Sequence, residues 1–146
     1  MTGQRNYKEP SYKHSDVTDK ILAAFYKVYN TLGYGFLEKV YENAMAIELR
    51  SMGLRVVQQE PITVYYAGEV AGEYFADLTV QGCVIVEIKA TRELAAEHEA
   101  QLLNYLKATP YEIGQLLNFG PKPQHIRRAF DNARKEWMTK SDADQR

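Results

Sequence analysis

The chain of 146 residues has a single cysteine, Cys83. An internal disulfide and a cysteine-based zinc cluster are therefore excluded. The apolar residues around Cys83 favour a small core side chain over a reactive thiol, which needs an exposed electropositive setting. The sequence also lacks an apolar run near the roughly 18 residues that a membrane-spanning helix needs, and residues 1–13 are too polar for a signal peptide. We therefore expect a cytoplasmic protein with no membrane contact.

An excess of charge of either sign is lacking too. The chain has 18 basic and 19 acidic residues, for a net charge of -1. No overall field draws it to nucleic acid, so any such contact must be local. A glycine-rich phosphate loop, an internal repeat and a low-complexity tract are also missing. The length and the 45% hydrophobic content are those of one ordinary globular domain.

The first part of this domain has apolar residues at helical spacing. Residues 15–32 are expected to form a helix that Ser15 or Asp16 caps and Gly33 ends. A second amphipathic helix is expected between Gly35 and Gly53, so the two form a helical hairpin. Residues 1–14 are expected to be a mobile polar arm, residues 15–130 the folded domain, and residues 131–146 a C-terminal helix or tail.

From Val56 to Lys89 the apolar spacing changes to every second residue, which predicts a three-stranded meander with a turn at Ala67-Gly68. Pro61 fits an edge strand or a bulge. A third helix is expected over residues 91–108 with Thr91 as its cap, followed by a strand over 112–120. Residues 126–130 fit either a last strand or the approach to a helix. This order predicts an α/β fold, a small mixed sheet with an antiparallel meander flanked by helices.

The meander carries three charges, Asp77, Glu87 and Lys89, where a buried hairpin would have apolar residues. A two-residue loop at Gln81-Gly82 pairs residue 77 with residue 86, which separates the two carboxylates. A three-residue loop ending at Gly82 pairs residue 77 with residue 85 and puts all three charges on one face. The two carboxylates are then diagonal neighbours, roughly 7 Å apart between Cα atoms.

Two carboxylates at that separation can hold a hard cation such as Mg²⁺ and leave positions for a phosphate oxygen and a nucleophile. Lys89 can then stabilise charge on phosphoryl oxygens. Phosphodiester hydrolysis fits this set. A half-exposed hairpin with an ordinary charged solvent face fits the same spacing.

Asp77 and the Glu87-Ile88-Lys89 triplet resemble the core motif of the PD-(D/E)XK nuclease superfamily, with alanine at residue 76 where the motif's name has proline. The stretch GFLEKVY, residues 35–41, resembles the GxxExxY signature that names a bacterial family within that superfamily. The resemblance runs from about Asp16 to about Phe130. It implies a restriction-endonuclease-like core.

The resemblance also implies roles for individual residues. Asp77 and Glu87 would be ligands of Mg²⁺, or of Mn²⁺, with the Ile88 carbonyl as a third ligand and Lys89 as a catalytic residue. Glu38 corresponds to the acidic residue of the first core helix, which assists the metal or its water. Tyr41 lies on the same side of that helix and is expected to contact nucleic acid. Gln101 and Tyr105 are similar to the QxxxY element of nucleases related to the RecB nuclease domain, which contacts DNA. A wet helix face explains their spacing equally well.

Three functions are compatible with these residues. The first is a Mg²⁺-dependent nuclease that hydrolyses phosphodiester bonds of DNA, with RNA not excluded as substrate. The second is a nuclease-like module that binds or regulates without turnover, and the third is a small-molecule hydrolase using Glu38 and Glu87. Because so small a domain covers few base pairs, cutting both strands would require a homodimer or a partner that presents the DNA. Tyr65, Tyr66 and Tyr74 would suit either such an interface or the core.

Overall fold

The computed structural model describes residues 13–138. In chain order its elements are α1 (Ser15–Leu32), α2 (Glu38–Ser51), β1 (Val56–Tyr66), β2 (Glu69–Val80), β3 (Val84–Lys89), α3 (Ala96–Ala108), β4 (Ile113–Phe119), β5 (Pro123–Ala129) and the 3₁₀ helix η3 (Asn132–Arg134). None of the helices within this range is both long and apolar enough to span a bilayer.

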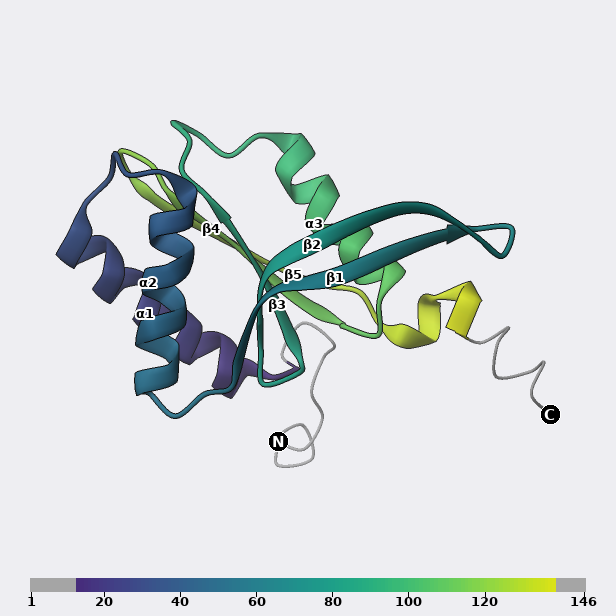
Figure 1. Cartoon of the computed structure of the whole chain (residues 1–146). Helices are drawn as coiled ribbons and strands as arrows, with labels where there is room; N and C mark the ends of the chain where they lie inside the picture. Colours follow the sequence, from purple (N-terminus) through teal and green to yellow (C-terminus); the bar gives the residue numbers. More distant parts are fainter. Residues whose placement is uncertain (1–12, 139–146) are drawn as a thin grey trace, which may run out of the picture.

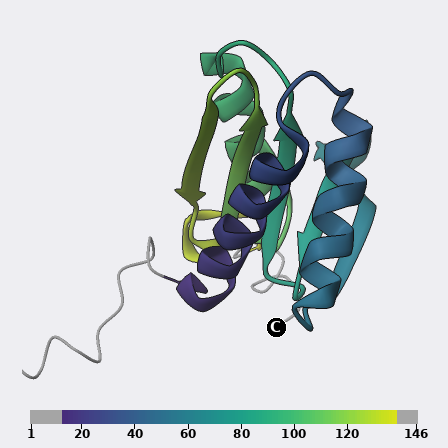
Figure 2. The ribbon, with the colours of Figure 1, turned by 90° about the vertical axis from the view of Figure 1, so that its left-hand side faces the viewer.

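The five strands form one mixed sheet in the order β1-β2-β3-β4-β5. All neighbours are antiparallel except β3 and β4, which are parallel and connected through α3. Helices α1 and α2 cover one face of the sheet and α3 the other (Figures 1 and 2). The predicted fold class is thereby confirmed. Pro61 lies on β1, which is an edge strand as its sequence indicated.

Each face of the sheet has its own apolar core. Under α1 and α2, alternate residues of β3 pack with the helices, and Phe25, Tyr41 and Phe119 are the largest buried side chains of this layer. Under α3, Leu102 and Leu106 pack on Ile85 and on neighbouring strands. Residues 84, 86 and 88 of β3 therefore face α1 and α2, and the odd-numbered residues face α3.

Two helix starts differ from the expectation. The N-cap of α1 is His14, and neither Ser15 nor Asp16 takes that position. Helix α3 begins at Ala96, five residues after the expected cap, Thr91. The reason is tertiary, because the Asn118 side chain accepts the Thr91 N–H at 2.9 Å and donates to the Thr91 carbonyl at 2.9 Å. These bonds hold residue 91 in a loop across the end of β4.

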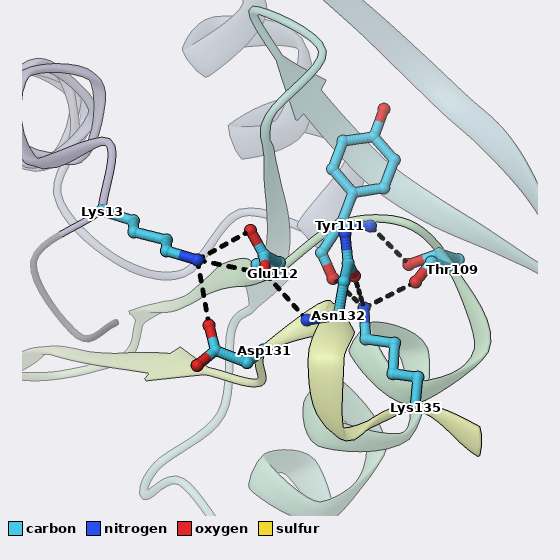
Figure 3. A network of polar contacts seen from close by, with 7 residues as sticks. All are labelled: Lys13, Thr109, Tyr111, Glu112, Asp131, Asn132 and Lys135. Atoms are coloured by element: carbon cyan, nitrogen blue, oxygen red, sulfur yellow. Dashed lines mark hydrogen bonds and ion pairs between the residues drawn. The ribbon is translucent and has the colours of Figure 1, made fainter. Parts of the chain in front are cut away.

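The sequence of residues 126–130 is compatible with a last strand or the approach to a helix. The structure has a strand here, since residues 123–129 form β5. Beyond it, η3 and helical residues 136–138 replace a continuous helix. This segment is held by Lys135, whose ammonium donates to the carbonyls of Thr109 and Tyr111 at 2.7 Å each and to the Asn132 side chain (Figure 3). The expected arm lies outside the described residues except for residues 13 and 14, and the expected C-terminal segment is described only to residue 138.

Candidate active site

The charged residues of the meander lie where β2 leaves β3. The ladder between these strands has only three residue pairs, from Val80 with Val84 to Leu78 with Val86. Beyond Leu78, β2 continues with β1 alone as a hairpin that projects from the sheet (Figure 1). At residues 77 and 87, β2 and β3 therefore no longer pair with each other.

Carboxylates take the place of the missing ladder bonds. The Asp77 N–H donates to the Glu87 carboxylate at 3.0 Å, and the Ile88 N–H donates to the Asp77 carboxylate at 2.8 Å. These two bonds satisfy backbone donors that would otherwise be orphaned. They also fix the two carboxyl groups side by side.

Both registers considered from the sequence are wrong. The loop does have three residues, but they are Gln81, Gly82 and Cys83, so Val80 pairs with Val84 and residue 77 faces residue 87. Gln81 and Gly82 both have positive φ, and the Cys83 N–H bonds to the Val80 carbonyl at 3.0 Å. The physical reason is that Gln81 itself adopts the left-handed conformation. The carboxylates are thus opposite neighbours and not diagonal ones.

The electrostatics of the pair follow from its burial. Only 5% of Glu87 is exposed. Burial, followed by the charge of Asp77, raises the pKa of the Glu87 carboxyl to about 8. Burial likewise raises the pKa of Asp77, opposed by the hydrogen bond from the Ile88 N–H. Two desolvated carboxyls that repel each other form a site in which a cation is favoured.

Lys89, on β3, and Glu38, on α2, both lie near the acidic pair. Lys89 is partly exposed on the same face of β3 as Glu87, and its charge lowers the pKa of both Asp77 and Glu87. Glu38 is the first residue of α2, and its carboxylate accepts the Ala90 N–H at 3.3 Å. Its charge raises the pKa of Glu87. The four residues expected to be catalytic are thus brought to one end of β3.

The comparison with known proteins identifies the family. Residues 15–129 match the sequence model of the PD-(D/E)XK nuclease superfamily. The chain belongs to this superfamily. No curated protein has a significantly matching sequence.

Two solved structures have a similar fold. The crystal structure of SSO0001 superposes with a TM-score of 0.50 at 16% identity, over 94% of this chain and 70% of that one. An alkaline exonuclease from Laribacter hongkongensis has a TM-score of 0.48 at 12% identity, over 94% and 93% of the two chains. At these identities the first likeness shows a shared fold and no more.

One residue expected to touch nucleic acid cannot do so. Tyr41 is fully buried. Its hydroxyl donates to the Gly33 carbonyl at 2.7 Å and accepts the Phe36 N–H at 3.2 Å, and its ring stacks on Phe119 at 4.3 Å. Tyr41 therefore has a structural role in this member of the superfamily. It fixes the turn between α1 and α2, and so the position of Glu38.

Gln101 and Tyr105 both lie on α3. Both line a groove between α3 and the β1–β2 hairpin. Tyr105 is 6% exposed, and burial, followed by the charges of Glu87 and Asp77, raises its pKa to about 12. Tyr105 therefore lies within electrostatic reach of the pair and Gln101 lines the same groove, while their contact with DNA stays a prediction.

Two further residues of the site escaped the sequence analysis. Glu42 is 3% exposed and accepts hydrogen bonds from Gln58 at 2.8 Å and Gln59 at 2.9 Å. Gln59 also donates to the Asp77 carboxylate at 3.3 Å and has a φ of 57° within β1. The spacing of four residues from Glu38 could have indicated Glu42. No sequence signal indicates a left-handed glutamine in a strand.

The donors fit a hard divalent cation. They are all oxygen atoms, and the desolvated pair gains most from a bound positive charge. Within residues 13–138, no three acidic, histidine or cysteine side chains converge into a metal cluster. Mg²⁺ accepts such a site, because it commonly binds one or two carboxylates and retains water and substrate oxygens for its other positions. A closed structural zinc site would need four protein ligands.

Proposed function

We propose that this member of the PD-(D/E)XK superfamily is a Mg²⁺-dependent nuclease, also served by Mn²⁺, that hydrolyses phosphodiester bonds of DNA. The observation that carries the proposal is the Asp77–Glu87 pair, in which Glu87 is buried and Asp77 partly buried, and whose carboxylates accept backbone N–H groups across the point where β2 and β3 part. The GFLEKVY stretch supports the finer placement in the GxxExxY branch, because its glutamate, Glu38, lies beside that pair.

Asp77, Glu87 and the Ile88 carbonyl would hold the cation, with Glu38 assisting. When bound, the cation would activate a water molecule and neutralise charge on the phosphate. Lys89 would stabilise the charge that develops on the phosphoryl oxygens from the same face of β3. The Asp77 and Ile88 N–H groups would keep the carboxylates in place during the reaction. Gln59 and Glu42 would orient Asp77 from the other side.

Cleavage of supercoiled plasmid and of labelled single-stranded DNA tests the proposal. We expect cutting by the wild-type protein with Mg²⁺ or Mn²⁺ and none in EDTA. Asp77→Asn should abolish cutting while keeping the acceptor for the Ile88 N–H. Lys89→Ala should reduce cutting by roughly 10²-fold or more, the typical loss when a donor to developing charge is removed.

Lys20→Ala, on α1, is the matched control for Lys89→Ala and should cut as the wild type does. Cutting that persists in Asp77→Asn would identify a contaminating nuclease. Intact cutting in a folded Lys89→Ala would remove Lys89 from the mechanism. A folded wild-type protein that binds Mg²⁺ without cutting any of these DNAs would support the alternative, a catalytically silent nuclease-like module.

A further inference from the structure

A groove of about 840 Å³ runs between α3 and the projecting β1–β2 hairpin. Its volume lies within the roughly 300–1,000 Å³ of small-molecule sites. Twelve residues line it, and four of them are aromatic: Tyr65, Tyr74, Tyr105 and Trp137. Tyr65, Tyr74 and Trp137 are exposed by 65%, 46% and 47%. Of the two placements left open for Tyr65 and Tyr74, an interface or the core, their exposure excludes the core, and their rings are available to a ligand.

The polar side chains that line the groove are uncharged or positively charged. Gln101 and Asn104 contribute amides, Thr63 a hydroxyl and Lys107 a positive charge, and no acidic side chain is among its lining residues. A chain with a net charge of -1 therefore presents here a surface whose one charged side chain is a cation. Lys107 is held above the Phe130 ring, 5.5 Å from its centroid. Aromatic faces beside a cation match nucleic-acid bases beside a phosphate.

The groove reaches the candidate active site through two tyrosines. Tyr105 lines the groove and lies within electrostatic reach of both Glu87 and Asp77. Tyr74 packs against it with ring centroids 5.9 Å apart, and is three residues before Asp77 on β2. A strand of nucleic acid whose bases lie along this wall would therefore extend toward the carboxylate pair.

We propose that this groove binds unpaired nucleotides, stacking their bases on Tyr65, Tyr74 and Trp137 and holding a phosphate near Lys107, so that the substrate is single-stranded DNA or a single-stranded end. The proposal rests on the proposed function for its connection to cleavage. Exposed aromatic rings favour unpaired over paired nucleotides, because the base faces of a duplex are already covered by their neighbours in the stack.

Trp137 is the single tryptophan of the chain, so its fluorescence reports on the groove without background from other tryptophans. The wild-type protein is titrated in EDTA, which prevents cutting, with oligothymidylate, with the same oligomer paired to oligoadenylate, and with an abasic oligomer of equal length. We expect saturable quenching by oligothymidylate. The duplex and the abasic oligomer should quench little, because neither offers free base faces.

Variants locate the site by anisotropy of the labelled oligomer. Tyr65→Ala and Trp137→Ala should each weaken binding roughly 5- to 150-fold, the range expected when one base–aromatic stack is lost. Tyr66→Ala is the matched control, because Tyr66 is the next residue on the same strand, is 79% exposed and does not line the groove. Trp137→Phe should retain most of the affinity, since it keeps a ring for stacking.

Equal quenching by duplex and single strand, or equal losses in Tyr65→Ala and Tyr66→Ala, would overturn the proposal. The proposal would also be overturned if Trp137 fluorescence were quenched in the absence of DNA as the protein concentration rises, and if sedimentation showed dimers over the same concentration range. A second copy of the chain would then occupy the groove. The outcomes separate from those of the cleavage assay. Quenching by oligothymidylate together with no cutting under Mg²⁺ would support the nucleotide-binding groove and refute the nuclease. Cutting under Mg²⁺ without such quenching would support the nuclease and refute the nucleotide-binding groove.

Discussion

Glu87→Gln should stabilise the metal-free protein increasingly as pH rises. Glutamine keeps an oxygen that can accept the Asp77 N–H and removes the buried charge. In the folded protein the pKa of Glu87 is raised from 4.5 to about 8. The folded state therefore holds this proton more tightly than the unfolded state does, and stability is lost as pH rises through that interval.

The magnitude follows from the size of the shift. One pKa unit corresponds to about 1.4 kcal/mol. Between pH 4.5 and pH 7 the ionisation of Glu87 should lower the free energy of unfolding by up to about 3 kcal/mol, and by up to about 5 kcal/mol at pH 8 and above. Below pH 4.5 the group is protonated in both states and contributes nothing to the pH dependence.

Urea unfolding in EDTA at one-unit steps from about pH 4 to pH 9 measures this difference. The gap between Glu87→Gln and wild type should widen with pH and level off near pH 8, and Mg²⁺ should narrow it by stabilising only the wild type. Glu97→Gln, at an exposed position of α3, should differ from wild type by a small constant amount. A gap for Glu87→Gln that stays constant from pH 5 to pH 8 would refute the reasoning.

Three further substitutions test the framework around the pair. Tyr41→Phe removes a buried hydroxyl that hydrogen-bonds to Gly33 and Phe36. It should lower the free energy of unfolding by roughly 1–3 kcal/mol in urea titrations. An unchanged unfolding midpoint would contradict the structural role of Tyr41. Gly120→Ala would place a Cβ 2.1 Å from the Thr91 carbonyl oxygen and so displace the loop that follows β3. It should lower the free energy of unfolding by about 1–3 kcal/mol, measured by thermal unfolding, and reduce cleavage in the plasmid assay. Lys135→Ala leaves the acceptors of Figure 3 without their donor and should lower the unfolding midpoint by an amount corresponding to roughly 1–3 kcal/mol, with Lys20→Ala as the control that leaves it unchanged.

The sequence predicted most of the fold because most of its elements follow hydrophobic periodicity. The spacing of Ile21 and Phe25 and the two-residue alternation of β1 are local signals that survive into the structure, whereas β3 is buried on both faces. The misplaced start of α3 has a different origin. Asn118 holds Thr91 from 27 residues away, and such a contact leaves no mark on the local pattern.

The sequence predicted which charged residues lie together, but not how they are arranged. Asp77, Glu87, Lys89 and Glu38 do meet at one end of β3, which a motif of residue types and spacings is able to indicate. Their arrangement depends on Gln81 adopting positive φ, which propensity disfavours for a residue with a Cβ. Tyr41 was misassigned for a related reason, since a motif position does not reveal whether a side chain supports the site or touches the substrate.

The short ladder between β2 and β3 has a consequence for how this scaffold can change. Beyond Asp77 the backbone ladder of the β1–β2 hairpin joins these two strands alone, so its length is not dictated by pairing with the rest of the sheet. Residues added or removed in register on both sides of the Ala67-Gly68 turn would alter how far the hairpin extends while leaving the positions of residues 77 and 87 unchanged. The length of the hairpin can thus vary independently of the carboxylate pair, and we expect members of the superfamily with the same pair to differ in hairpin length.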